Sequence, residues 1–124
     1  MPLTILFAED HETVRSAVKE TLELEGWRVD ACADGRAALA RLEGGARYDL
    51  LLFDHELPGV GGLELVRRVR ALAHRGRTPI IVISASDARA EARRAGADAF
   101  LRKPQDVELL VGAVKGLVGR GREG

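Results

Sequence analysis

The chain has 124 residues, the length of one ordinary domain, and its balance of 46% hydrophobic and 31% charged residues is typical of a folded, water-soluble protein. Its 19 basic residues cancel its 19 acidic ones, which argues against binding a polyanion through bulk charge. The single cysteine, Cys32, excludes an internal disulfide and favours a reducing compartment such as the cytoplasm. No apolar run approaches the roughly 18 residues of a membrane span, and we expect no signal peptide in MPLTILFAED.

Strand-like and helix-like segments alternate along the chain. Short apolar or alternating runs predict strands, and longer runs with apolar residues three or four positions apart predict helices. In chain order we expect strand 3–8, helix 11–26, strand 27–32, helix 34–45, strand 48–54, helix 61–76, strand 78–85, helix 87–96, strand 97–104 and helix 105–119. Leu24 is expected at the edge of the first apolar stripe. We assign residues 1–119 to one domain and 120–124 to a polar, frayed tail.

Strands that alternate with helices predict an α/β fold, in which helices cover both faces of one parallel sheet. The apolar runs at 50–53 and 80–83 are continuous, as expected for strands that are buried on both faces. In such sheets, ligands bind at the carboxyl ends of the strands, near the point where the strand order reverses. The residues that follow each strand are therefore the candidates for a site.

Polar side chains stand at the ends of four predicted strands. Glu9 and Asp10 follow the first strand, Asp54 ends the third, Ser84 ends the fourth and Lys103 ends the fifth. Like charges about 4 Å apart repel by about 4 kcal/mol at an effective dielectric constant near 20. Lys103 offsets only part of the repulsion among three carboxylates, so we expect a divalent cation to offset the rest.

The donor set indicates the chemistry. Oxygen ligands without a cysteine cluster favour a hard cation, Mg²⁺ or Mn²⁺. A carboxylate beside a hydroxyl, an ammonium group and a cation suits phosphoryl transfer, with Asp54 as the nucleophile that forms an acyl phosphate. A single acid at a strand end often only caps the next helix, as Asp10 could, but the whole set favours a site.

The order of these motifs resembles that of the response-regulator receiver domain over nearly the whole chain. The motifs are the acidic pair ED, the strand DLLLFD that ends at Asp54, the loop LPGVGG, the segment ISA with Ser84, and GADAFLRKP with Phe100 and Lys103. Each motif is weak alone, but five of them in this order are specific.

The resemblance implies a flavodoxin-like sheet with strand order 2-1-3-4-5. It implies that a histidine kinase or a histidine phosphotransfer protein phosphorylates Asp54. Mg²⁺ would be held by Asp10, Asp54 and the backbone carbonyl of Glu56, with Glu9 acting mostly through water. Phe100 would be the aromatic switch residue.

We therefore expect a phosphoacceptor that switches a protein-interaction surface, and not an enzyme with a separate substrate. Two alternatives stay open. A small aspartyl-phosphate hydrolase needs an acid two residues after its nucleophile, where Glu56 stands, but 124 residues leave no cap domain and little room for a substrate pocket. A phosphate-independent binding module should lack site residues, and a nucleotide binder should carry a glycine-rich phosphate loop; the sequence shows neither feature.

Two further expectations concern the surroundings of the site. A transition-metal site at His11, Asp54, His55 and Glu56 is disfavoured, because neighbouring side chains diverge at a strand end. The segment between Ser84 and the Gly-Ala-Asp motif is shorter than is common in the family by about three residues, nearly one helical turn. Helix 87–96 should therefore be short and weakly anchored, and we expect a monomer that contacts neither nucleic acid nor membrane.

Overall fold

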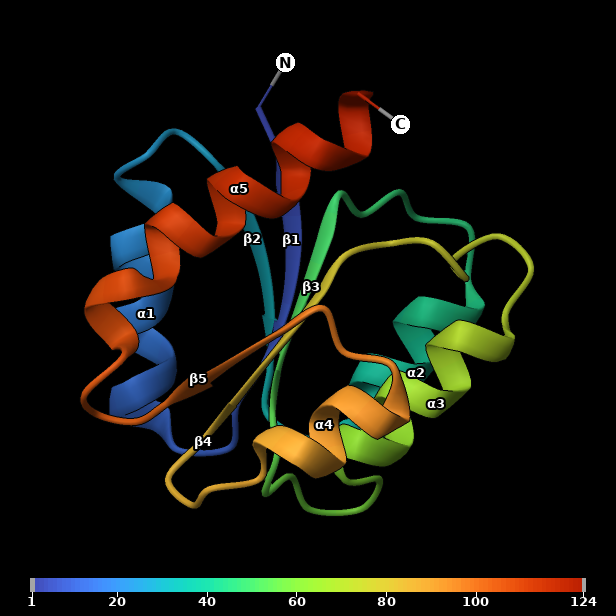
Figure 1. Cartoon of the computed structure of the whole chain (residues 1–124), viewed down its shortest axis with the longest axis horizontal. Coiled ribbons are helices and arrows are strands. Elements are labelled where there is room, and N and C mark those ends of the chain that lie inside the picture. Colours follow the sequence, from blue (N-terminus) through green and yellow to red (C-terminus); the bar gives the residue numbers. More distant parts are fainter. Residues whose placement is uncertain (1, 124) are drawn as a thin grey trace.

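The computed structural model describes residues 2–123 as one sheet between two layers of helices (Figure 1). The strands are β1 (Thr4–Ala8), β2 (Arg28–Cys32), β3 (Leu50–Asp54), β4 (Ile80–Ser84) and β5 (Ala99–Arg102). The helices are α1 (Glu12–Glu23), α2 (Gly35–Glu43), α3 (Gly62–Ala71), α4 (Arg89–Ala95), the 3₁₀ turn η1 (Val107–Leu109) and α5 (Leu110–Glu123). All four strand pairings are parallel and the order is β2-β1-β3-β4-β5, which confirms the predicted fold and strand order.

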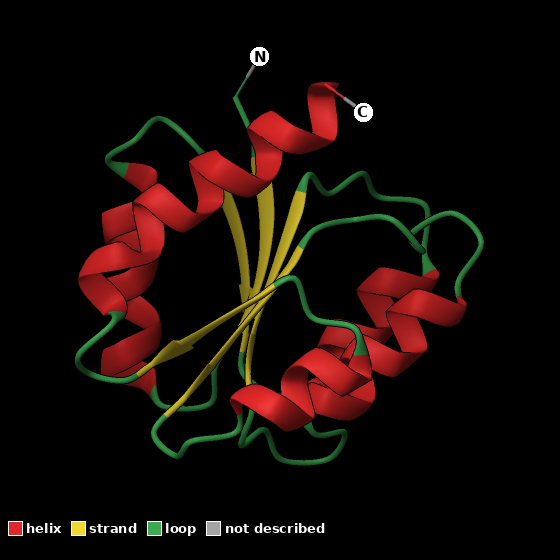
Figure 2. Ribbon diagram, in the orientation of Figure 1, coloured by secondary structure: helices red, strands yellow, loops and turns green. Residues whose placement is uncertain are grey.

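Helices α1 and α5 cover one face of the sheet, and α2, α3 and α4 cover the other (Figure 2). Successive strand residues point to opposite faces, so each strand contributes to two cores. Phe7 and Leu52 belong to the core under α1 and α5, whereas Phe53 and Val82 belong to the core under α2, α3 and α4. Every residue of β3 and β4 is buried, which explains their continuous apolar sequences.

The ends of the helices depend on local caps and on one buried arginine. Asp34 accepts a hydrogen bond from the backbone N–H of Ala37 at 2.8 Å and caps α2. Helix α3 ends at Ala71, five residues before the predicted end at residue 76. The loop that follows is held by Arg75, which is only 3% exposed and donates to the backbone carbonyls of Leu42, Gly44 and Ala46, in and just after the last turn of α2.

The expectation for Leu24 was wrong. Leu24 is 80% exposed, because α1 ends at Glu23 and the chain turns at Gly26, where φ is +86°. Helix α5 continues to Glu123, beyond the predicted helix end at residue 119, and Gly124 lies outside the described residues. None of the described helices is both long enough and apolar enough to cross a membrane.

Candidate functional site

The carboxyl edge of the sheet gathers the residues that the sequence analysis singled out. Glu9 and Asp10 follow β1, Asp54 is the last residue of β3, Ser84 is the last residue of β4 and Lys103 follows β5. Because β1, β3, β4 and β5 are adjacent and parallel, these residues lie at one edge of the sheet. The backbone fixes their spacing: the N–H of Lys103 donates to the carbonyl of Ser84 at 2.8 Å.

Three carboxylates and one ammonium group form the centre of the site. Lys103 Nζ lies 3.0 Å from Glu9 Oε1 and 3.4 Å from Asp54 Oδ2. Carboxylate oxygens of Glu9, Asp10 and Asp54 all lie within 4.8 Å of one another. Glu9 is fully buried and Asp54 is 2% exposed, whereas Asp10 is exposed. The arrangement offers oxygen ligands to a divalent cation and a neutralising lysine to an anion beside Asp54.

Burial and crowding give the buried acids unequal pKa values. Burial raises the pKa of Asp54 to about 7, and the adjacent Glu9 adds to the rise while Lys103 opposes it. For Glu9, burial alone would raise the pKa, but hydrogen bonds from Asp54, Lys103 and the His11 N–H hold it below its usual range. Of the two acids, Asp54 therefore binds a proton the more readily and Glu9 the less readily. The proton must leave before Asp54 can act as a nucleophile.

Lys103 and Arg15 hold the acidic pair in place. The pKa of Lys103 is raised, because its ion pairs with Glu9 and Asp54 outweigh the effect of its own burial. Arg15 donates to the backbone carbonyl of Glu9 at 2.9 Å and to that of Asp10 at 3.4 Å. The sequence analysis missed Arg15. Its position one turn into α1 was the only available signal, and a basic residue there is usually solvated.

The Glu56 side chain is half-exposed and lies against the end of β4. Its Oε1 accepts from Ser84 Oγ at 2.8 Å and from Ser86 Oγ at 3.2 Å. Burial alone would raise the pKa of Glu56, but these hydrogen bonds, that of Ser84 above all, lower it. Its backbone N–H donates to Asp54 Oδ1 at 3.3 Å. Ser86 was also missed by the sequence analysis, since nothing in the pattern distinguishes it from an ordinary loop serine.

Phe100 belongs to β5 and packs in the core that α4 covers. It is only 7% exposed, and the guanidinium carbon of Arg89 lies 5.3 Å from the centre of its ring. Phe100 lines a cavity of about 220 Å³ together with three alanines and the charged residues Arg89, Arg93 and Asp98. Helix α4 has only seven residues, which confirms the predicted short helix. Phe100 thus occupies an inward position with free volume next to it.

The two histidines of the disfavoured transition-metal site serve other contacts. His11 Nδ1 accepts from the N–H of Val14 at 3.4 Å and caps α1. His55 Nδ1 lies 3.4 Å from Ser84 Oγ and 3.6 Å from Glu56 Oε1. Within residues 2–123, Glu9, Asp10 and Asp54 form a cluster whose carboxylate oxygens lie close enough together to hold one metal ion. The structure therefore fits a hard cation at the carboxylates.

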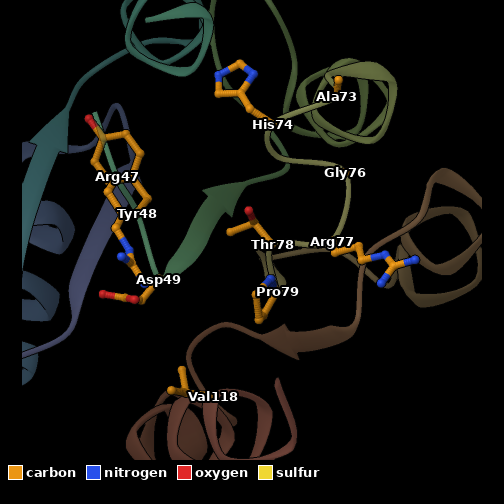
Figure 3. Close-up of a pocket in the computed structure, with 10 residues that line it drawn as sticks. All are labelled: Arg47, Tyr48, Asp49, Ala73, His74, Gly76, Arg77, Thr78, Pro79 and Val118. Carbon is orange, nitrogen blue, oxygen red and sulfur yellow. The ribbon is translucent and has the colours of Figure 1, made fainter. Parts of the chain in front are cut away.

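A second hollow, of about 470 Å³, lies at the opposite edge of the sheet (Figure 3). Its basic side chains do not converge: Arg77 is directed away from Arg47 and His74. The ring of His74 is already held by the carbonyls of Leu42 and Gly44, at 3.2 and 3.1 Å. The hollow therefore offers no focused site, and the chemistry of the chain lies at the carboxyl edge.

Comparisons with known proteins agree with this site. The family model described as response regulator receiver domain matches residues 5–115. The chain belongs to the response regulator receiver domain family. The transcriptional regulatory protein TrcR of Mycobacterium tuberculosis is 35% identical over 122 residues, which are 96% of this chain and 46% of that protein. The chain thus spans about half the length of the curated relatives it matches.

Two solved receiver structures are similar over nearly their full length. The receiver domain of sensor histidine kinase PA1611 from Pseudomonas aeruginosa, with a magnesium ion in its active-site cleft, has a TM-score of 0.87 and 30% identity, and the match covers 96% of this chain and 99% of that one. The response regulator TrrA of Thermotoga maritima, in complex with Mg²⁺ and beryllofluoride, has a TM-score of 0.83 and 32% identity, and the match covers 94% of this chain and 99% of that one.

Proposed function

We propose that this receiver domain accepts a phosphoryl group on Asp54 in a Mg²⁺-dependent reaction. The observation that carries the proposal is the placement of Asp54: a buried carboxylate that ends the central strand β3, with Lys103 at 3.4 Å and two further carboxylates within 4.8 Å. Such a group is poorly solvated and closely surrounded by charge, which suits a nucleophile that acts beside a cation. An aspartate with only a structural role would not need a lysine and two further carboxylates beside it.

The cation would be held by Asp10, Asp54 and the backbone carbonyl of Glu56, with Glu9 acting mostly through water. When bound, Mg²⁺ or Mn²⁺ neutralises charge on the phosphoryl oxygens. The acidic pair supplies the oxygen donors that either ion prefers, and Arg15 fixes their backbone.

The chain's own residues perform the remaining steps. One oxygen of the ionised Asp54 carboxylate attacks the phosphorus of a phosphohistidine. The P–N bond breaks, its electron pair returns to the donor imidazole, and a P–O bond to Asp54 forms. Lys103 balances the negative charge that gathers on Asp54, and the Ser84 hydroxyl donates to a phosphoryl oxygen. The phosphoryl group brings a charge of about −2, which shifts a protein-interaction surface.

The proposed partners follow from this chemistry. The phosphodonor is a histidine kinase or a histidine phosphotransfer protein, and the downstream target is another protein. We propose that the domain works in the cytoplasm as a monomer, with no nucleic acid or membrane contact of its own. The activity of the longer relatives, which are named as transcriptional regulators, belongs to those proteins.

One incubation separates the candidate functions. The protein is mixed with acetyl phosphate, with MgCl₂ or with EDTA, and its intact mass is followed over time. A phosphoacceptor gains one labile phosphoryl group only when Mg²⁺ is present. A hydrolase would consume many equivalents of acetyl phosphate, and a phosphate-independent binding module would gain none; either result contradicts the proposal.

A further inference from the structure

The Ser84 hydroxyl is fully engaged in the resting structure. Ser84 is completely buried, and its Oγ donates to Glu56 Oε1 at 2.8 Å. The same oxygen atom of Ser84 accepts from the N–H of Ser86 at 3.1 Å and lies 3.0 Å from Ser86 Oγ. A serine hydroxyl has a single proton. Ser84 therefore cannot donate to a phosphoryl oxygen until it releases Glu56.

The hydrogen bond from Ser84 to Glu56 must break, and it is stronger than an ordinary hydrogen bond. A hydroxyl that donates to a carboxylate forms a charge-assisted hydrogen bond, roughly twice as strong as a bond between neutral groups. Glu56 Oε1 also accepts from Ser86 Oγ at 3.2 Å, so the carboxylate keeps a second partner when Ser84 turns away. The backbone N–H of Glu56 donates to Asp54 Oδ1 at 3.3 Å, which places the carboxylate beside the position of the phosphoryl group.

We propose that Glu56 is a latch that holds the Ser84 hydroxyl away from the phosphoryl position; this inference rests on the proposed function of Asp54. A phosphoryl group of about −2 charge on Asp54 competes with the Glu56 carboxylate for the Ser84 proton and repels that carboxylate. Phosphorylation must therefore release the latch before Ser84 completes the site. Glu56 is a positioning residue that acts through Ser84 and sets how readily the domain switches.

The substitution Glu56→Gln tests the latch with little change in shape. The amide oxygen still accepts from Ser84, but the bond loses its charge, so release should be easier. Beryllofluoride mimics a phosphoryl group. From the difference in strength between a charged and a neutral hydrogen bond, we expect Glu56→Gln to bind it about tenfold more tightly than the parent does when Mg²⁺ is present. Ser86→Ala should weaken beryllofluoride binding slightly, because it removes the partner that the Glu56 carboxylate keeps when Ser84 turns away.

A double-mutant cycle separates the latch from simple charge repulsion. Beryllofluoride affinity is measured by isothermal titration calorimetry in MgCl₂ for the parent, Glu56→Gln, Ser84→Ala and the double variant. The latch predicts that Glu56→Gln tightens binding clearly more in the parent than in the Ser84→Ala background, where only the loss of charge repulsion remains. The same gain in both backgrounds would show that Glu56 acts by charge alone, and no gain in either would also overturn the latch.

Two controls make the outcome specific. Glu91→Gln removes one exposed carboxylate on α4, where Glu91 Oε1 lies 3.6 Å from an Arg94 nitrogen, and should leave the affinity unchanged. In the absence of beryllofluoride, Glu56→Gln should shift the NMR signal of the Ser86 amide, which donates to Ser84 Oγ. If the parent itself binds no beryllofluoride, the proposed function fails; if it binds but the cycle shows no coupling, only the latch fails.

Discussion

The substitution Asp54→Asn should stabilise the metal-free protein, and the gain should depend on pH. In the parent, Asp54 is buried against Glu9, and its pKa is raised from 3.8 to about 7. The folded state therefore holds the proton more tightly than the unfolded state. Asparagine is neutral at every pH, and its amide group can donate to Glu9 as protonated Asp54 does.

The sign and the size of the effect follow from proton linkage. The stabilising contribution of protonated Asp54 is complete below pH 3.8 and is lost as the pH rises through about 7. The whole rise in pKa corresponds to about 4 kcal/mol, so the variant should be more stable by about 2 to 4 kcal/mol at about pH 8. Glu9 has the opposite sign: its lowered pKa contributes stability that is lost as the pH falls below 4.5.

Urea denaturation in EDTA, followed by circular dichroism from about pH 5 to about pH 8, measures the gain in unfolding free energy. Asp87→Asn, at an exposed aspartate in the loop before α4, is the matched control and should show no such trend. Adding MgCl₂ should reduce the difference in unfolding free energy between variant and parent, because the ion binds and stabilises the parent with Asp54 ionised. A gain that is constant across this pH range, or a variant less stable than the parent at high pH, would refute the reasoning.

Three further predictions concern the switch, the lifetime of the phosphoryl group and the output face. Ser84→Ala should abolish the phosphorylation-induced NMR shifts around Phe100, which should themselves be modest because Phe100 already lies inward; unchanged shifts would contradict the coupling. Glu56→Ala should slow loss of the phosphoryl group by up to about tenfold, since it removes a carboxylate that can orient water and frees Ser84; a decay rate equal to or above the parent's would exclude this. Helix α4 (Arg89–Ala95) should show weak protection in hydrogen exchange, and sedimentation of the beryllofluoride-bound protein should show a monomer; a tight dimer whose interface maps to α4 would disprove it.

The fold could be predicted because its main determinants are local in the sequence. Continuous apolar runs predicted β3 and β4, and apolar residues three or four positions apart predicted the five helices. The site could be predicted in outline, because a parallel sheet brings every strand end to one edge. The convergence of Glu9, Asp10, Asp54 and Lys103 is thus a property of topology, which the pattern reveals without knowledge of any side-chain rotamer.

Features that depend on side-chain direction could not be predicted. Arg75 looks like part of a solvated helical face, yet it is buried against the last carbonyls of α2 and holds the loop after α3. Arg70, a polar residue of the same predicted helix, likewise donates to the backbone carbonyls of Gly96 and Thr78. These arginines compensate the partial negative charge at helix ends and loop carbonyls, which a hydrophobic pattern does not register. The contact between Glu56 and Ser84 escaped prediction for the same reason.

The central claim is that Asp54 carries the phosphoryl group, and chemical trapping tests it most directly. The protein is phosphorylated with acetyl phosphate and MgCl₂, reduced with borohydride, digested and mapped by mass spectrometry. Borohydride converts an aspartyl phosphate to homoserine, so the account predicts homoserine at position 54 in the parent and no phosphorylation of Asp54→Asn. A phosphoryl group on His55 or Ser84, with Asp54 unmodified, would contradict the account.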